Sequence, residues 1–420
     1  MTEADRLNAI LARDAPAVAR ALSPLGRRAA FPRGIPWQAD QARSARINAT
    51  IGQLTDGRGN PMPLESLAGG LADLDPHMAW LYAPVEGPFS LRGDWMKRQL
   101  RLAGDPATPV SLPVVTHGLT HCLSVVSSLF SDDEATILLP DPVWENYNLL
   151  FGMMVTPRFE RWRFFDEEGR LDLDSFAAAV GRVRGKLIVV LNFPGNPSGY
   201  MPTTDEVGQI AEVLRRAPGP LVVVCDDAYQ GWVYADDRHP RSPFWDLAER
   251  LDPERATVWK VDGATKELLF FSSRVGFLTH SNPGGEAEEA LLSKMKMIIR
   301  GTVGSPSGPA MALIRRGLAS SDLDRQFSER RAELGARWSL LSAGLARLSG
   351  SILQPLPFNG AFFALLAVAE GTDPEALRLR LLHEHGVGVV AFPRAIRLAY
   401  CSLHRDDIPL LVERLAQVAG

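Results

Sequence analysis

The sequence predicts an α/β protein that has a large domain, with a mainly parallel sheet flanked by helices, and a smaller α+β domain. Between residues 135 and 279, short apolar runs rich in β-branched residues alternate with helical patterns. This alternation is typical of parallel strands buried between helices. After one long amphipathic segment, residues 322–348, the elements become shorter and more mixed. We therefore expect a large domain over residues 61–318 and a small domain built from residues 1–60 and 319–420.

The size and composition are those of an ordinary soluble globular protein. The chain has 420 residues, of which 46% are hydrophobic and 22% charged, and this length suffices for about two domains. The net charge of −4 gives no electrostatic basis for binding nucleic acid or an acidic membrane surface. The three cysteines form no C-x-x-C pair, so neither a disulfide framework nor a metal site is indicated. Without a signal-peptide layout or a run of about 18 apolar residues, the protein is expected in the cytoplasm.

The N-terminal part is expected to be helical and then extended. Residues 1–28 show helical spacing, which the proline-rich stretch 32–36 ends. Residues 47–52 are expected to form a short strand that ends at Gly52, where a glycine allows either a turn or a close backbone approach. A helical segment follows at residues 90–102.

A glycine and a threonine open the next predicted helix. Gly118, Leu119 and Thr120 precede the apolar run 123–130. Free backbone N–H groups at the positive end of a helix, together with a hydroxyl, suit a phosphate. A simple helix cap by Thr120 is the alternative interpretation.

The remaining strands and helices follow in order. Apolar runs predict strands at residues 135–139, 186–193, 220–225, 256–261 and 276–279. A capping-box pattern predicts a helix over residues 203–214. Beyond the long helix, the small domain is expected to contain strands at residues 360–366 and 396–401 and helices at residues 373–385 and 405–418.

Polar residues follow three of these strands at the points where the strands end. They are Asn196, Asp226, Tyr229 and Lys266. Ligands of open α/β sheets bind at the carboxyl ends of the strands, so these four side chains would gather at one rim. Each of them has an ordinary structural interpretation, such as a turn, a cap, a core position or a surface charge. Their coincidence at consecutive strand ends instead indicates a site.

Lys266 and Arg274 form a pair with a specific chemical meaning. A lysine in a partly apolar pocket can lose its proton and act as a nucleophile or Schiff-base former. An arginine nearby supplies a fork for a phosphate. These are the groups that pyridoxal phosphate (PLP) needs, although the two residues taken alone could also be surface charges.

Seven segments together carry a resemblance to a known family. They are Ile47-Asn-Ala-Thr-Ile-Gly52, Tyr82-Ala-Pro-Val-Glu-Gly87, Asp141-Pro-Val-Trp-Glu-Asn-Tyr147, Asn196-Pro-Ser-Gly199, Asp226-Asp-Ala-Tyr-Gln-Gly231, Thr265-Lys266 with Arg274-Val-Gly276, and Arg397. In this order, over about residues 32–418, the chain resembles the PLP-dependent aminotransferases of fold type I. It is most similar to the aspartate and aromatic amino acid aminotransferases. The resemblance implies the PLP-transferase fold, with a seven-stranded type of sheet, and PLP as cofactor.

The resemblance also implies a role for each matching residue at the cofactor ring. Lys266 would bind PLP as a Schiff base and later move the substrate proton. Asp226 would pair with the pyridine nitrogen and keep it protonated. Tyr229 and Asn196 would hydrogen-bond the phenolic oxygen, and Trp144 would stack on the ring face.

The phosphate would be held by a separate set of residues. Gly118, Leu119 and Thr120 would offer the helix end, and Arg274 the guanidinium. Tyr82 would reach the phosphate from the neighbouring subunit, which implies a homodimer with shared active sites.

The substrate would bind on the open side of the cofactor. Arg397 matches the arginine that holds the α-carboxylate, a planar bidentate partner. Gly52, Trp144 and Asn196 would line the same place. Arg300 is placed like the arginine that binds a dicarboxylic side chain across the dimer, and a solvated charge at a helix end is its alternative.

Four positions depart from the family pattern. Gly263 stands where a phosphate-binding serine is usual, and Leu119 replaces a small residue. Tyr147 takes the place of a histidine that supports the pyridine aspartate, and His121 the place of a glycine. None of these positions carries a group that the chemistry requires.

We therefore expect an enzyme that moves an amino group between an α-amino acid and a 2-oxo acid by a ping-pong mechanism. The expected donors are aromatic or dicarboxylic amino acids, and the expected acceptor is 2-oxoglutarate. A PLP-dependent β-eliminating lyase would use the same Lys266, Asp226 and Arg274. A ligand-sensing regulator on the same fold would carry a DNA-binding domain, for which the residues before Phe31 are too few.

Overall fold

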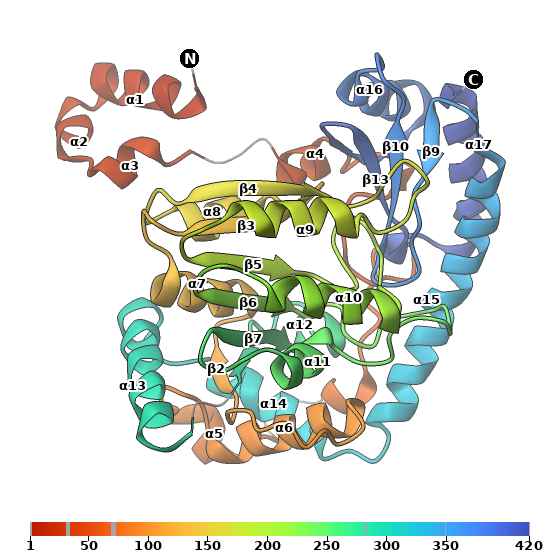
Figure 1. The fold of residues 1–420 in the computed structure, drawn as a ribbon. Helices are drawn as coiled ribbons and strands as arrows, with labels where there is room; N and C mark the ends of the chain where they lie inside the picture. The colour runs from red at the N-terminus through yellow and green to blue at the C-terminus, as the bar shows by residue number, and fades with distance from the viewer. Residues whose placement is uncertain (1, 31–33, 69–72, 282–283, 349, 420) are drawn as a thin grey trace.

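A computed structural model describes residues 2–30, 34–68, 73–281, 284–348 and 350–419 (Figure 1). Its centre is a seven-stranded sheet in the order β2-β8-β7-β6-β5-β3-β4. The strands are β2 (Val114–Thr116), β3 (Thr136–Asp141), β4 (Arg158–Arg163), β5 (Leu187–Leu191), β6 (Leu221–Asp226), β7 (Ala256–Gly263) and β8 (Gly276–His280). The five strands from β4 to β7 run parallel, whereas β8 is antiparallel to both β7 and β2. The expected mainly parallel sheet is confirmed.

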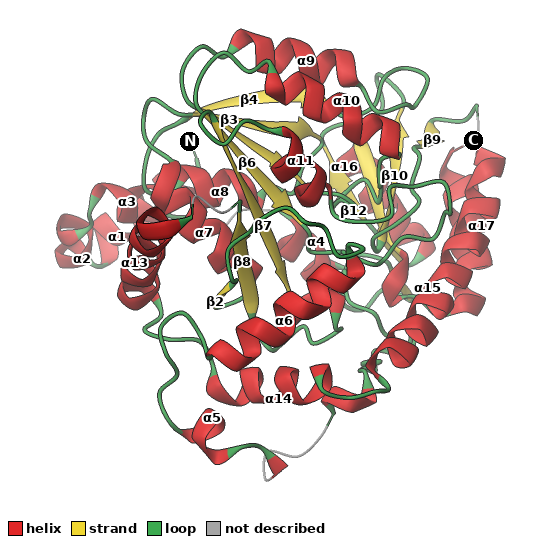
Figure 2. Ribbon diagram, turned by 60° about the horizontal axis from the view of Figure 1, so that its bottom comes forward, coloured by secondary structure: helices red, strands yellow, loops and turns green. Residues whose placement is uncertain are grey.

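Alternation along the strands sends side chains into two cores, one on each face of the sheet. Val222 and Val224 of β6 pack toward α7 (Leu119–Phe130), and Val223 and Cys225 pack toward the opposite face. That opposite face is covered by α9 (Leu173–Arg182), α10 (Thr204–Arg215) and α11 (Pro243–Arg250), as Figure 2 shows. The strands are therefore buried on both sides, which is why they are apolar almost throughout.

Further helices flank β8 and the outer side of α7. Trp95 of α6 (Phe89–Leu102) stacks on Phe277 of β8 with ring centroids 4.1 Å apart. The other helices of this region are α5 (Pro76–Trp80), α8 (Asn146–Gly152), α12 (Ala264–Glu267), α13 (Gly285–Thr302) and α14 (Gly308–Leu318). Among the described residues no helix is both long and apolar enough to cross a membrane.

A four-stranded antiparallel sheet forms the smaller unit, in the order β12-β13-β10-β9. Its strands are β9 (Leu353–Pro355), β10 (Phe363–Val368), β12 (Val390–Phe392) and β13 (Ala395–Ala399). The long helix α15 (Leu323–Leu345) leads into it (Figure 1). Helix α16 (Pro374–His385) packs against β12 and β13, and α17 (Ile408–Ala419) packs against α15 and α16. The exact domain boundaries at residues 61 and 318 remain a prediction.

The N-terminal elements differ from expectation. Residues 1–28 form three short helices in the described part, α1 (Glu3–Asp14), α2 (Pro16–Ala21) and α3 (Pro24–Arg28), because Pro16 and Pro24 each restart the helix. A fourth helix, α4 (Ile35–Gln41), follows. The strand expected at 47–52 is only β1 (Ile47–Asn48), paired with β11 (Val387–Gly388).

Two strands of the large sheet were not expected. β2 has only three residues, and β4 has the mixed sequence RFERWR because it lies at the sheet edge and is partly exposed. Neither segment shows the apolar run of a central strand. The predicted strands of the parallel core agree with the structure to within a few residues.

Candidate active site

A cavity of about 290 Å³ lies at the carboxyl ends of β5, β6 and β7 and is closed by the small antiparallel sheet. Ten of the predicted site residues line it: Gly52, Leu119, Thr120, Trp144, Asn196, Asp226, Tyr229, Lys266, Arg274 and Arg397. Residues 50–52 and α4 complete the wall. The strand ends therefore gather one set of side chains, although these come from distant parts of the chain.

Lys266 lies in α12, a single helical turn that begins directly after β7. Its side chain reaches the cavity, with Nζ 5.2 Å from the centre of the Tyr229 ring. Burial lowers the pKa of the Lys266 ammonium, the carboxylate of Asp226 opposes that shift, and Arg274 adds to it. A lysine of lowered pKa can supply a neutral amine, which is the form that attacks a carbonyl.

Asp226 and Asp227 point in opposite directions at the end of β6. Asp226 lines the cavity, accepts a hydrogen bond from the Tyr147 hydroxyl at 2.5 Å and one from the Ala228 backbone N–H at 3.1 Å. Asp227 lies on the other side and pairs with Lys260 at 2.7 Å. Burial raises the pKa of the Asp226 carboxyl, and the bond from Tyr147 opposes this rise.

The N-terminus of α7 and the guanidinium of Arg274 form an anion cradle. Gly118 has φ of 77°, and a Cβ added to it would lie 2.6 Å from Nη2 of Arg274. In the described part of the chain, Arg274 lines the cavity and has no hydrogen bond or ion pair to a protein group, and Oγ1 of Thr265 is buried without a partner. Helix N–H groups, an unpaired guanidinium and a free hydroxyl together fit a phosphate.

Two departures from the family pattern at this cradle explain each other. A Cβ added to Gly263 would lie 2.8 Å from Cδ1 of Leu119 and 2.7 Å from the Val275 carbonyl oxygen. Leu119 therefore occupies the space that a side chain at residue 263 would need. His121 points away, bonding Oγ1 of Thr302 at 2.8 Å, and so ties α7 to α13.

Arg397 of β13 forms a second anion site on the opposite side of the cavity. Its Nη1 donates to Oδ1 of Asn196 at 2.9 Å and its Nη2 to the Thr50 carbonyl at 2.7 Å. Its Nε is buried and has no hydrogen-bond partner in the part of the chain that the structure describes, and the guanidinium lies 4.3 Å from the centre of the Phe363 ring. Burial lowers the pKa of Arg397 to about 10, and Tyr229 opposes this shift. A buried arginine without a carboxylate partner is suited to a substrate carboxylate.

Further residues contribute that the sequence patterns did not single out. Asn192 donates to the Asp226 carbonyl at 2.7 Å and accepts from the Asn196 backbone N–H at 2.8 Å, so it joins two strand ends. The signal was a lone polar residue near the end of an otherwise apolar strand. The remaining unassigned part of the wall is mostly apolar: Ile35, Ala39, Ile51, Ala228 and Phe363.

Three predicted residues are not part of the cavity wall, and one of them, Gly118, lies beside it at the start of α7. Tyr82 is 98% exposed, and Arg300 is exposed in the last turn of α13. Both were expected to act on a neighbouring subunit, so their roles remain predictions.

One cavity thus contains a lysine of lowered pKa, a cradle suited to a phosphate, and a buried arginine suited to a carboxylate. This combination is typical of an enzyme that uses a phosphorylated carbonyl cofactor. A family model described as aminotransferase class I and II matches residues 46–415. The chain therefore belongs to this family and is a PLP-dependent aminotransferase, as the sequence resemblance predicted.

Two relatives indicate the range of the family around this chain. It is 24% identical over 322 residues to the cytoplasmic aspartate aminotransferase of Caenorhabditis elegans, covering 73% of this chain and 76% of that protein. It is 27% identical over 321 residues to the probable N-succinyldiaminopimelate aminotransferase DapC of Mycobacterium tuberculosis, covering 74% and 73%.

Solved structures share the fold. An aminotransferase from Anaerococcus prevotii has a TM-score of 0.83 at 18% identity, over 95% of this chain and 99% of that chain. The aromatic-amino-acid aminotransferase of Burkholderia pseudomallei, solved covalently bound to pyridoxal phosphate, has a TM-score of 0.74 at 21% identity, over 95% and 100%.

Proposed function

We propose that this aminotransferase moves the amino group of an aromatic or dicarboxylic α-amino acid to a 2-oxo acid such as 2-oxoglutarate, in two half-reactions at one site. The observation that carries the proposal is Arg397, a buried guanidinium in the same cavity as Lys266 that has no carboxylate partner among the described residues. Two substrates that share an α-carboxylate can use this arginine in turn.

The residues of the cavity have the chemistry to hold PLP. The cofactor supplies an aldehyde for the amino group and a ring that accepts electrons. Its phosphate would be held by Arg274 and by the start of α7, which consists of Gly118, Leu119 and Thr120. Asp226 would pair with the ring nitrogen, and Trp144 would cover one ring face.

Two side chains of the cavity have separate roles: Lys266 would move the proton, and Tyr229 would donate a hydrogen bond to the cofactor. Because burial lowers its pKa, Lys266 can accept the proton from the substrate α-carbon and return it at the other end of the transfer. Burial raises the pKa of the Tyr229 hydroxyl well above its ordinary value, so this group stays neutral and donates a hydrogen bond. Asn196, which also bonds Arg397, would hold the cofactor and the substrate carboxylate in register.

The walls of the cavity support the aromatic half of the substrate proposal. Trp144, Phe363, Ile35 and Ile51 face the space beside Arg397 and Gly52, and such walls favour an apolar side chain. The proposal that dicarboxylic amino acids also bind depends on Arg300 of a neighbouring subunit.

We also propose a homodimer with shared sites in a reducing cytoplasm. Large apolar side chains are exposed at Trp80, Leu81, Tyr82, Phe89 and Met297, and such a group of residues favours a protein interface. The ion pair between Lys296 and Glu86, at 3.0 Å, keeps the segment of Tyr82 beside the helix that carries Arg300. The three cysteines are buried free thiols, which agrees with a reducing compartment.

The test is the visible absorbance of the purified protein with PLP, before and after adding glutamate, aspartate, phenylalanine and tyrosine separately. A band that one donor removes and 2-oxoglutarate restores would demonstrate both half-reactions and name the donor. Lys266→Ala should lack the band of covalently bound cofactor. If the wild type also lacks it, the role of Lys266 is wrong. If pyruvate and ammonia form without an acceptor, the β-eliminating lyase replaces the transferase.

The dicarboxylic half has its own test. Arg300→Ala should lower turnover of aspartate and glutamate by at least about tenfold, because one charge-assisted contact is lost. Turnover of phenylalanine and tyrosine should stay close to the wild type. Equal turnover of all four donors in both proteins would remove dicarboxylic amino acids from the proposal.

A further inference from the structure

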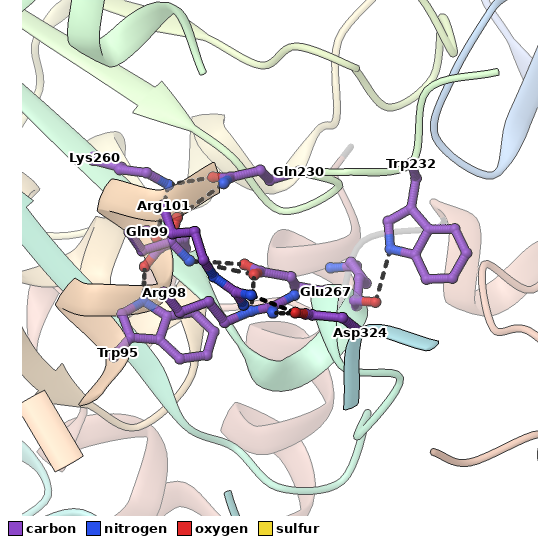
Figure 3. Close-up of polar contacts among 11 residues, drawn as sticks. Trp95, Arg98, Gln99, Arg101, Gln230, Trp232, Lys260, Glu267 and Asp324 are labelled. Atoms are coloured by element: carbon purple, nitrogen blue, oxygen red, sulfur yellow. Dashed lines mark hydrogen bonds and ion pairs between the residues drawn. The ribbon is translucent and has the colours of Figure 1, made fainter. Parts of the chain in front are cut away.

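A group of buried charged side chains lies directly behind Lys266, on the side away from the cavity. Glu267, the next residue in α12, is 1% exposed. Its carboxylate accepts from Nε of Arg98 at 3.1 Å and from Nε2 of Gln99 at 3.2 and 3.3 Å. Figure 3 shows the side chains of Arg98 and Gln99 converging on Glu267.

Arg98 has a second partner in a different part of the molecule. Its Nη1 donates to Oδ1 of Asp324 at 2.9 Å, and Asp324 lies in the first turn of α15 (Figure 3). Arg101 bonds the other oxygen of the same carboxylate. Arg98 therefore bridges the lysine turn and the start of α15.

Helix α15 is also bonded to the segment that carries Arg397, the proposed substrate arginine. Arg337 of α15 donates from Nη1 to the carbonyl of Cys401 at 2.7 Å, four residues after Arg397. The start of the helix is thus connected through Arg98 to the turn of Lys266, and a point further along it is bonded directly to the segment of Arg397. Its length fixes the separation between these two contacts.

We propose that Arg98 is a positioning residue for Lys266: it holds the lysine turn through Glu267 and ties that turn to α15 through Asp324. The inference rests on the proposed role of Lys266.

The geometry needs such support because α12 is only one turn long. A four-residue helix has no stability of its own, so tertiary contacts must set its direction. Trp232 supplies one, donating from Nε1 to the Lys266 carbonyl at 3.0 Å (Figure 3). The ion pair of Glu267 and Arg98 supplies directional bonds on the other side. A buried ion pair is often no more stabilising than apolar side chains of similar volume, so orientation is the function that it serves here.

The lysine turn is also connected to the segment of Tyr229. Gln99 accepts from Gln230 at 2.9 Å, and Gln230 in turn accepts from Nζ of Lys260 at 2.6 Å. Gln230 directly follows Tyr229, so the same network borders two of the proposed catalytic segments.

The test compares Glu267→Gln and Asp324→Asn with the wild type by hydrogen–deuterium exchange, without added PLP. Exchange of the backbone amides of residues 264–270 should accelerate by at least about tenfold in Glu267→Gln, which loses the charge on one side of the pair. Asp324→Asn should accelerate the same amides several-fold, because Arg98 loses one of its two carboxylates. Asp322→Asn is the matched control: Asp322 lies at the same helix end, and among the described residues it forms an ion pair with Arg325 alone.

A second measurement distinguishes positioning from simple core packing. With PLP bound, the pH midpoint of the visible absorbance should shift in Glu267→Gln and Asp324→Asn and stay in place in Asp322→Asn. Unchanged exchange at residues 264–270 in the two variants would overturn the inference. If Glu267→Gln does not fold, the half-exposed Asp324 still decides the outcome. The exchange result is independent of Lys266 binding PLP, and a wild type without a visible band would refute only the proposed function.

Discussion

Tyr147 and Asp226 illustrate how single residues set the chemistry of the cavity. Burial raises the pKa of the Tyr147 hydroxyl well above its ordinary value, so the group stays protonated and donates to the carboxylate. A histidine at this place could also carry a charge, whereas a tyrosine supplies only the neutral donor. Tyr147 in place of a histidine therefore still donates a hydrogen bond to Asp226, but it does not change its charge near neutral pH.

The prediction at this scale is that Tyr147→Phe lowers kcat/KM by about tenfold or more, since a hydrogen bond to a charged group is lost. Asp226 would then be harder to keep ionised, and the pH–rate profile should shift toward higher pH. Tyr234→Phe is the control, because its hydroxyl is also buried and donates to the Ala361 carbonyl outside the cavity. Equal kinetic losses in the two variants would show that Tyr147 acts only through stability.

Among the single elements, the start of α7 has the geometry that the proposed phosphate site requires. Gly118 precedes the helix with a positive φ, which places the first free N–H groups against Arg274. Gly276 of β8 packs equally closely, since a Cβ added there would lie 2.6 Å from the carbonyl carbon of Gly118. The cradle thus depends on glycines that permit close backbone contact.

Gly118→Ala should weaken PLP binding by about tenfold, because the added Cβ displaces the Arg274 guanidinium. The measurement is the dissociation constant of PLP from equilibrium dialysis. Gly104→Ala is a matched control, since Gly104 has the same φ of 77° and no atom within 4 Å of the added Cβ. Both variants should lose about 1 kcal/mol of stability from backbone strain, and only the first should lose cofactor affinity.

At the scale of the whole molecule, the two sheets bring Lys266 and Arg397 into one cavity. A second copy of the chain would add Tyr82 and Arg300, which are exposed here. The site would then be divided among three units, namely the large sheet, the small sheet and the neighbouring subunit.

Mixed dimers test this division. Lys266→Ala and Tyr82→Ala should each reduce activity strongly when pure. If Tyr82 serves the neighbouring subunit, an equal mixture should regain about a quarter of the wild-type activity, because half of the dimers are hybrids with one intact site. No recovery after exchange of subunits would place Tyr82 and Lys266 in the same chain's site.

The buried charges also make stability depend on pH. Burial raises the pKa of Asp262 to about 7 from its ordinary 3.8, and Lys260 opposes the shift. The folded protein then holds a proton that the unfolded chain releases, so the free energy of unfolding falls as pH rises through this window. Asp262→Asn should remove about 1 to 3 kcal/mol of this dependence. Thermal unfolding between about pH 5 and 7.5 measures it, with the exposed Asp322→Asn as control. A slope identical to the wild type would contradict the assignment.

The parallel core, the family and most of the cavity residues could be predicted from the amino-acid sequence alone. Apolar β-branched runs mark buried strands wherever they occur, and strand ends carry the polar residues of motifs such as the one around Asp226. These patterns are local in sequence, so they can be recognised without knowledge of the fold.

The remaining features depend on contacts between segments that are distant in sequence. The edge strand β4 has no apolar run because one side faces water, and Leu119 and Gly263 explain each other only when β7 and α7 are in contact. The bridge from Glu267 through Arg98 to Asp324 joins three segments that no spacing connects. Contacts between elements distant in sequence depend on packing, and packing is set by the whole chain rather than by any local pattern.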